Sequence, residues 1–308
     1  MSGRDAGSDL IDALHALGDF VAALEYEKLP PVVRERTRLV LTDLVGVTIA
    51  GARTPELRAL LTAWAPPPGL VPILGTTIAT SADDAAWLNG VAACALELDE
   101  GNKHAQGHPA AHAVFAALAA ASTAGRPVAG GDLLSAVVAG YEVAARFGHA
   151  TRRRADLHTH GHWGATGAGA AAGRLSRLPA EGIAAAIDNA AALTFVTPWS
   201  VVLAGSFVRN LWIAGANVAG LIAARLALAG LAQVDGNAGR TLGEVVGTLD
   251  VGRSSTTSAR AGTSPAGTSS ATPPARTRTR PPTPSSRCAS GTGSPPRRSR
   301  AWWYAPMC

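Results

Sequence analysis

The sequence predicts an all-α fold, a large helical domain whose core is built from small aliphatic side chains. Three observations carry this prediction. First, 47% of the 308 residues are hydrophobic but only 5% are aromatic, so Ala, Val and Leu must fill most of the core. Second, apolar residues recur at helical spacing, whereas the alternation typical of strands is almost absent. Third, Gly, Pro and Asp stand where these segments begin and end, as they do at helix ends.

The helical segments can be followed along the chain. Residues 10–24 form an amphipathic pattern that Leu29-Pro30-Pro31 interrupts. Pro31 suits the first turn of a second helix, which Gly51 closes. We expect these and later elements to form one domain over residues 8–250. Further helices are predicted at 82–98, 110–124, 131–148, 164–176, 180–193 and 207–231, and a strand at 71–78.

The positive charge of the chain lies in its last part. The formal net charge is +5, but nine of the 27 basic residues and none of the 22 acidic ones lie in residues 253–308, which leaves −4 for residues 1–252. The stretch 253–300 contains no Leu, Ile, Val or Phe, so it cannot bury enough apolar surface to fold. It is a disordered tail, an arginine-rich tail that binds nucleic acid, or GC-rich DNA translated out of frame. We favour the last interpretation.

Other features exclude several classes of protein. Cys94, Cys288 and Cys308 form no spaced pair, so no zinc or iron–sulfur ligand set is visible, and we expect no metal and no cofactor. No signal peptide is visible, which makes the cytoplasm the default compartment. The most membrane-like run, residues 211–234, carries Arg225 near its middle, where a bilayer would impose a cost of ~2.5–3.5 kcal/mol. We expect a buried helix there and no membrane partner.

A cluster of titratable residues lies between two alanine-rich helical segments. Residues 97–112 hold three carboxylates, one of the two lysines and three of the eight histidines. Desolvating a charge is costly unless the charge is paired or has a function. The pattern therefore favours one wall of an acid–base active site, with a solvated loop as the plain alternative. The members are Glu97, Asp99, Glu100, Lys103, His104, His108 and His112.

Pro109 argues against a metal site on this segment. His104, His108 and His112 have the i, i+4 spacing of ligands on one helix face. Pro109, however, fits best in a first helical turn, which leaves His108 just outside the helix and His104 in the preceding loop. His108 would then stand at a helix N-terminus, where the helix dipole favours anion binding.

Two more segments could carry chemistry. His158, His160 and His162 alternate as in the His-x-His motif of metallohydrolases, but no preceding strand and no further acidic ligands are visible. A structural alternative is that one of these histidines caps the next helix. Arg209 and Asn210 open the long apolar helix, where they could hold a carboxylate by two hydrogen bonds. The plain alternative is a surface helical turn.

Taken in order, these segments resemble the MmgE/PrpD family, which includes 2-methylcitrate dehydratase, cis-aconitate decarboxylase and iminodisuccinate epimerase. The resemblance covers about residues 8–250. It is carried by Leu29-Pro30 with Leu41-Thr-Asp43-Leu-Val-Gly46, by Glu97-Leu-Asp99-Glu-Gly-Asn before His108-Pro109, by Gly140-Tyr141-Glu142-Val143, and by His158 six and nine residues before Gly164 and Gly167.

The resemblance implies a large helical domain with a smaller α/β lid, an active site between them and a homodimer that needs no metal. It implies His108 and His158 as the catalytic histidines. Asn102 stands near a position often occupied by Thr, and Arg209 stands where many members have a lysine. We expect Asn102, Arg209 and Lys103 to bind the substrate.

The catalytic carboxylate is less defined. Asp99 is our choice, and Glu97 and Glu100 are alternatives if the register of the acidic segment is shifted.

The implied function is a metal-independent lyase that acts by acid–base chemistry on a small di- or tricarboxylate, as a hydro-lyase similar to 2-methylcitrate dehydratase. Decarboxylation and epimerisation pass through the same carbanion-like state, so both remain alternatives to dehydration. One alternative is a metal-dependent hydrolase that uses His158, His160 and His162, and another is a non-enzymatic, arginine-tailed nucleic-acid-binding protein. The tail of residues 253–308 begins where a lid is expected, so we expect the lid to be largely missing and leave open whether this chain is active.

Overall fold

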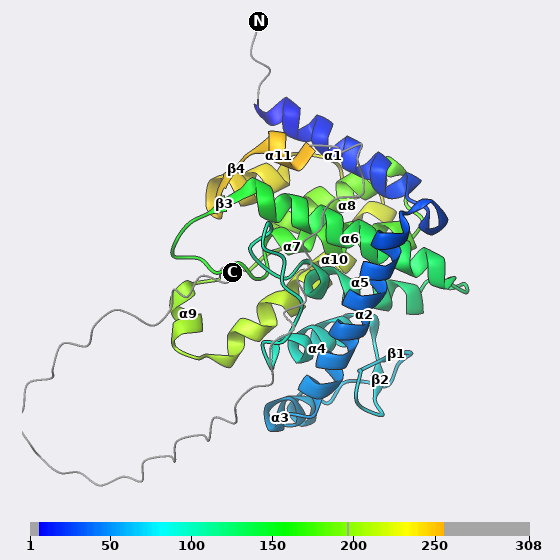
Figure 1. Ribbon diagram of the computed structural model, residues 1–308, viewed down its shortest axis with the longest axis vertical. Helices are drawn as coiled ribbons and strands as arrows, with labels where there is room; N and C mark the ends of the chain where they lie inside the picture. The colour runs from blue at the N-terminus through cyan, green and yellow to red at the C-terminus, as the bar shows by residue number, and fades with distance from the viewer. Residues whose placement is uncertain (1–5, 196, 256–308) are drawn as a thin grey trace, which may run out of the picture. The chain divides into compact units, whose positions relative to one another are not determined.

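The computed structural model describes residues 6–195 and 197–255, and it confirms the all-α fold class (Figure 1). The α-helices are α1 (Ala6–Ala23), α2 (Pro31–Ala52), α3 (Pro55–Trp64), α4 (Ala82–Cys94), α5 (Pro109–Ser122), α6 (Gly130–Ala150), α7 (Trp163–Leu175), α8 (Ala180–Ala192), α9 (Trp199–Leu203), α10 (Asn210–Leu228) and α11 (Val251–Ser255). Single 3-10 turns, η1 (Tyr26–Lys28) and η2 (Phe207–Arg209), and a π-helical segment, η3 (Gly239–Val245), join them. The short strands are β1 (Val71–Pro72), β2 (Ala79–Thr80), β3 (Thr151–Arg153) and β4 (Gly247–Leu249).

The helices predicted from the sequence are confirmed, with ends that differ by a few residues. The prediction of one strand over residues 71–78 is wrong. The strands β1 and β2, of two residues each, pair as an antiparallel hairpin, and the residues between them form its turn. Gly75 has a φ of 78°, a conformation that glycine adopts without strain and that breaks an extended run. The predicted tail lies outside the described residues from 256 onward, and its first three residues complete α11.

Helix α3 was not predicted, although the sequence carries a start signal for it. The Thr54 side chain accepts a hydrogen bond from the Leu57 backbone N–H, and Pro55 occupies the first helical position. The helix has only ten residues, too few for a clear apolar repeat.

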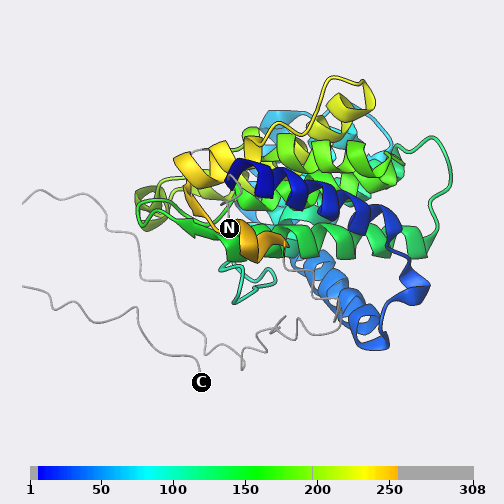
Figure 2. The same cartoon turned by 90° about the horizontal axis from the view of Figure 1, so that it is seen from above.

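Helix α7 lies at the centre of the bundle, where it packs against α5, α6, α8 and α10 (Figure 1). Its glycines make these contacts close. A Cβ at Gly167 would collide with the carbonyl oxygen of Gly140 on α6, and one at Gly169 with the carbonyl oxygen of Ala186 on α8. Figure 2 shows α1 (dark blue) along the bundle, where it packs against α8. The small residues of the sequence therefore serve close helix packing.

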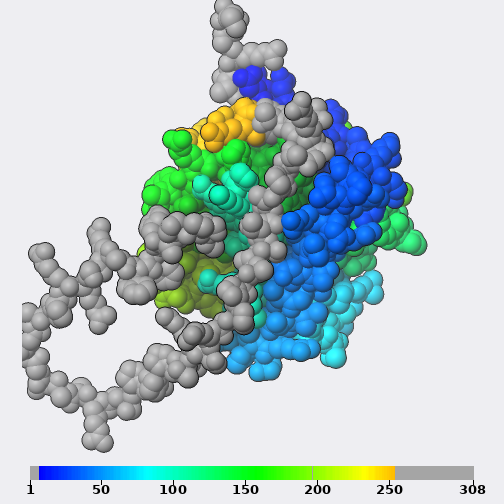
Figure 3. All heavy atoms as spheres, viewed as in Figure 1, coloured from blue at the N-terminus to red at the C-terminus, as the bar shows by residue number. Residues whose placement is uncertain are grey.

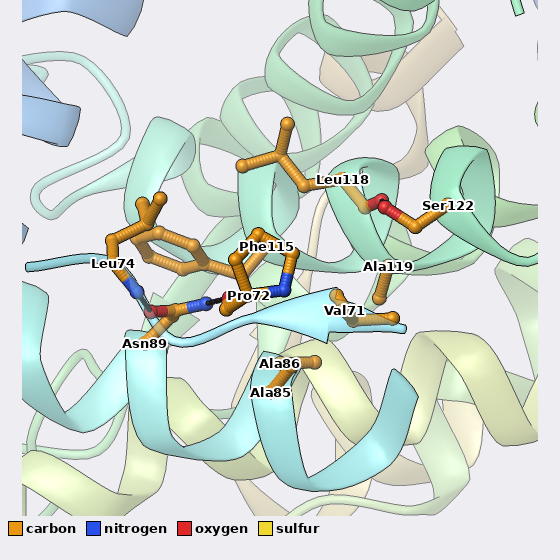
Figure 4. Close-up of a pocket in the computed structure, with 10 residues that line it drawn as sticks. All are labelled: Val71, Pro72, Leu74, Ala85, Ala86, Asn89, Phe115, Leu118, Ala119 and Ser122. Carbon is orange, nitrogen blue, oxygen red and sulfur yellow. Dashed lines mark hydrogen bonds between the residues drawn. The ribbon is translucent and has the colours of Figure 1, made fainter. Parts of the chain in front are cut away.

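The β1–β2 hairpin packs beside α4 and is fixed by Asn89 of that helix (Figure 4). The Asn89 amide donates to the Pro72 carbonyl at 3.0 Å and accepts from the Leu74 N–H at 2.8 Å. The cavity next to it, about 80 Å³, is apolar, and no titratable side chain lines it. We therefore do not consider it a site for chemistry.

Helix α10 is a core helix in this fold. The stretch Phe207–Leu228 is long and apolar enough to cross a membrane, but 61% of its most apolar 18-residue window is buried within the protein, where α10 packs against α4, α5, α7 and α8. Asn217 near its middle is buried, accepts from the Ala116 N–H and donates to the Ala111 carbonyl of α5. A buried amide with these partners ties α10 to α5.

Asp188 is expected to be a major determinant of stability. This buried carboxylate of α8 accepts hydrogen bonds from the backbone N–H groups of Asp235, Asn237 and Ala238. Hydrogen bonds to a charged acceptor contribute about 1.5–3 kcal/mol each, and their loss leaves donors without a partner. Asp188→Ala should lower the free energy of unfolding by about 3 kcal/mol or more, measured by urea denaturation. Asp235→Ala, an exposed position in the same loop, is the matched control, and an equal loss in both variants would contradict this role.

Candidate active site

Three segments far apart in the sequence meet at one place. They are the loop between α4 and α5, the segment that leads into α7, and the η2 turn before α10. The loop, drawn in turquoise in Figure 3, reaches the surface. The contacts among these segments bring most of the predicted site residues together.

The loop before α5 has the geometry that Pro109 predicts. Pro109 is the first residue of α5, His108 is its N-cap, and His104 lies in the loop. Asn102 closes the loop, because its side-chain oxygen accepts from the backbone N–H groups of His104 and Ala105. The three histidines at 104, 108 and 112 therefore do not share a helix face.

Asp99 and His108 form a carboxylate–imidazole pair in which the carboxylate is buried and the imidazole partly exposed. Asp99 Oδ2 lies 3.3 Å from His108 Nδ1, and the Glu100 carbonyl oxygen lies 2.7 Å from the same nitrogen. Burial raises the pKa of Asp99, against the opposing influence of His108. Two acceptors at Nδ1 place the imidazole proton there and leave the Nε2 lone pair available. The His108 side chain is 28% exposed.

His160 lies between the two histidines that we expected to be catalytic. Its ring centroid is 4.9 Å from that of His108 and 4.2 Å from that of His158. His158 in turn stacks on Trp199 at 4.5 Å. His108 and His158 thus belong to one cluster, which the sequence separates by 50 positions.

The surroundings of His158 fix its proton on the other nitrogen. The His160 backbone N–H donates to His158 Nδ1 at 3.3 Å, so the neutral ring carries its proton on Nε2. Burial lowers the pKa of His158 to about 3, and the cations Arg153 and Arg209 act in the same direction. At neutral pH His158 is an uncharged N–H donor.

His112 and His162 are structural members of the same cluster. His112 Nδ1 donates to the His108 carbonyl at 2.7 Å, and Nε2 accepts from the Gly161 N–H at 3.0 Å. Burial lowers the pKa of His112 to about 3 and that of His162 to about 4. The alternative that a histidine caps α7 is wrong, because His162 stands at the N-cap but its ring bonds to the His158 carbonyl instead.

Arg209 supplies a cation at the edge of the cluster. Its guanidinium is mostly buried and forms an ion pair with Glu97. Arg209 also acts on the pKa of both Asp99 and His158, which places it within electrostatic reach of the two sides of the site. The next residue, Asn210, has a buried side-chain oxygen for which the described residues offer no partner.

Lys103 and Asn102 lie differently from the histidines. Lys103 is exposed on the loop, and within residues 6–195 and 197–255 no contact joins it to the cluster. Asn102 is buried, and its amide donates to the Tyr141 hydroxyl at 3.0 Å. Through these hydrogen bonds Asn102 holds the loop in its conformation.

A hydrogen-bond network behind the loop was not predicted from the sequence. The Tyr141 hydroxyl donates to Glu100 at 2.9 Å, and burial raises the pKa of Glu100 to about 7. The available signal was a tyrosine among small residues on the predicted helix 131–148, which suggests a buried hydroxyl that needs a partner.

The His158, His160 and His162 triplet does not form a ligand set. Within the described ranges, no group of three or more His, Cys, Asp or Glu side chains is arranged to hold a metal ion. His158 Nδ1 and His162 Nε2 are already bonded to the backbone. A cavity of about 540 Å³ adjoins the triplet, with His162 and Trp199 in its wall.

Comparisons with known proteins agree with the resemblance seen in the sequence. Residues 15–236 match the sequence pattern described as the MmgE/PrpD N-terminal domain. The chain is also similar to cis-aconitate decarboxylase of Aspergillus terreus, and to that of A. terreus strain NIH 2624 / FGSC A1156. Each is 31% identical over 158 residues, which cover 50% of this chain and 32% of the relative. The match thus spans about a third of the length of these relatives.

Proposed function

The chain belongs to the MmgE/PrpD family, and from this we propose that it is a metal-independent hydro-lyase acting on a small di- or tricarboxylate. The family and the similarity to a decarboxylase support a lyase-type enzyme in general. One observation of the site carries the finer proposal: His108 and His158, with His160 between them, hold their protons on opposite nitrogens. His108 is prepared to accept a proton, and the neutral His158 ring is prepared to donate a hydrogen bond.

The proposed reaction uses these two tautomers. His108 Nε2 removes the proton next to a substrate carboxylate, with Asp99 stabilising the imidazolium that forms. His158 Nε2–H donates a hydrogen bond to the leaving β-hydroxyl, and the His108 imidazolium returns its proton to that hydroxyl, which departs as water and leaves both rings neutral. Arg209 exchanges its Glu97 partner for a substrate carboxylate and stabilises the enediolate charge, and Lys103 adds a second cation from the loop.

Decarboxylation is the second candidate, since the relatives at 31% identity are named cis-aconitate decarboxylase. It needs the same carbanion-like state, with loss of CO₂ in place of proton removal. We further propose a homodimer in the cytoplasm, with no cofactor and no nucleic-acid or membrane partner.

The experiment that tests this function is turnover of a panel of hydroxylated and unsaturated di- and tricarboxylates, followed by NMR. We expect loss of water from at least one member, and this activity should survive dialysis against EDTA. Release of CO₂ would select the decarboxylase. Stoichiometric zinc together with activity lost to the chelator would favour the metal-dependent hydrolase that uses His158, His160 and His162. No turnover of any member would contradict the proposal.

A further inference from the structure

Glu100 is a buried carboxylate that connects three elements. Its Oε1 accepts from the Tyr141 hydroxyl of α6 at 2.9 Å, and its Oε2 accepts from the Ala110 N–H of α5 at 3.1 Å. The Ala110 N–H belongs to the first turn of α5, where backbone donors have no partner within the helix. The side chain of Glu100 therefore ties the loop to both helices.

Tyr141 extends this connection to the other end of the loop. Its hydroxyl accepts from the Asn102 amide at 3.0 Å while it donates to Glu100. The Asn102 oxygen in turn holds the backbone N–H groups of His104 and Ala105. The loop is thus held at Glu100 and at Asn102 by a single phenol, and the two residues lie directly before the segment that ends at His108.

The main chain of Glu100 contacts the proposed base. Its carbonyl oxygen lies 2.7 Å from His108 Nδ1, closer than the Asp99 carboxylate at 3.3 Å. Both side-chain oxygens of Glu100 are occupied by donors other than the imidazole. Glu100 therefore acts on His108 through its backbone, and its side chain sets where that backbone lies.

We propose that Glu100 and Tyr141 are positioning residues that keep His108 in the tautomer with its proton on Nδ1. The role of that tautomer in catalysis rests on the proposed function, but the tautomer is a property of the unliganded protein. The two neighbouring carboxylates thus have different roles. Asp99 contacts the imidazole directly, whereas Glu100 holds the loop around the imidazole in place.

The inference can be tested by ¹⁵N–¹H correlation spectra of the histidine rings, which report the tautomer of each. In the native protein we expect His108 to be protonated on Nδ1. Glu100→Gln has one side-chain oxygen for two donors, and Tyr141→Phe removes the phenol, so both variants should show a new population with the proton on Nε2. Glu142→Gln is the matched control, since it neutralises a partly buried carboxyl on the same helix, the one beside Tyr141 that pairs with Arg146. It should leave the His108 signals unchanged.

Activity separates this inference from the proposed function. With an active substrate, both positioning variants should lower kcat about tenfold or more with little change in KM. If both variants stay folded and His108 remains wholly protonated on Nδ1, the inference is wrong, whatever His108→Gln does to turnover. If the tautomer shifts as expected but His108→Gln retains full turnover, the positioning stands and the proposed base is wrong. Should Glu100→Gln fail to fold, Tyr141→Phe alone decides, because it removes one oxygen atom.

Discussion

Acidification from about pH 7 to about pH 4 is expected to lower the free energy of unfolding by several kcal/mol. The cause is the buried histidine cluster, in which burial lowers the pKa of each ring. For His112 and His158 the pKa is about 3, for His162 it is about 4, and for His160 it lies well below the usual value. The unfolded chain has ordinary histidines with a pKa of about 6.5, so it binds more protons than the folded state over this range.

The sign and size of the effect follow from linkage. A depressed folded pKa contributes stability above pH ~6.5 that is lost as the pH falls, at about 1.4 kcal/mol per pH unit for a fully buried ring. Burial raises the pKa of Asp99, Glu100 and Glu142, and these carboxyls oppose the loss, because a raised carboxyl pKa contributes stability at low pH. The stabilising contribution of these carboxyls stops growing below pH ~4.5, because the carboxyls of the unfolded chain also take up protons there. Below that pH the histidines continue to destabilise the fold. The net loss of stability on acidification then approaches the whole free energy of unfolding of an ordinary domain.

The measurement is urea unfolding at a series of pH values. His162→Gln retains an amide donor for the His158 carbonyl and removes the titration, so it should recover roughly 2 kcal/mol near pH ~4.5 relative to its effect at pH ~7.5. Glu100→Gln should act in the opposite sense, because it removes an opposing carboxyl. His15→Gln, which removes a half-exposed histidine paired with Glu181, is the matched control. A pH dependence that His162→Gln leaves unchanged would show that the cluster is not the cause.

The fold was largely predictable because helical periodicity, and the Pro and Gly residues at helix ends, depend only on residues that are close in the sequence. Pro31 and Pro109 opened helices as expected. The strand predicted over residues 71–78 is a hairpin instead, and the Asn89 side chain that holds it belongs to α4, outside the segment itself. The pairing of β3 with β4 joins residues about 100 positions apart and left no local pattern.

The site was predictable only where its members lie close together in the sequence. Residues 97–112 stood out because titratable groups interrupt an apolar context. The position of His160 between His108 and His158 could not be predicted, since it depends on how α5 and α7 pack. Nor could the sequence distinguish Asp99 from Glu100. Adjacent residues face different groups here, and only the bonds to His108 and Tyr141 separate their roles.

His108 and His158 are expected to have different roles, and their loss should affect different steps. His108→Gln should reduce turnover by roughly 10²–10⁴-fold, the range for removal of a general base. His158→Phe removes the Nε2–H donor and should slow departure of the hydroxyl by roughly 10²-fold but leave proton removal intact. Trp199 and the backbone of Thr197 hold His158 in place, so the chain around it should stay folded.

The most direct test of this account is hydrogen–deuterium exchange into the polycarboxylate panel in D₂O, followed by ¹H NMR together with product formation. The native protein should exchange the proton next to a carboxylate and form product, His108→Gln should do neither, and His158→Phe should still exchange that proton but form product much more slowly. If folded His108→Gln exchanges the proton as fast as the native protein, or if folded His158→Phe forms product at the native rate, the roles described here for the two histidines are wrong.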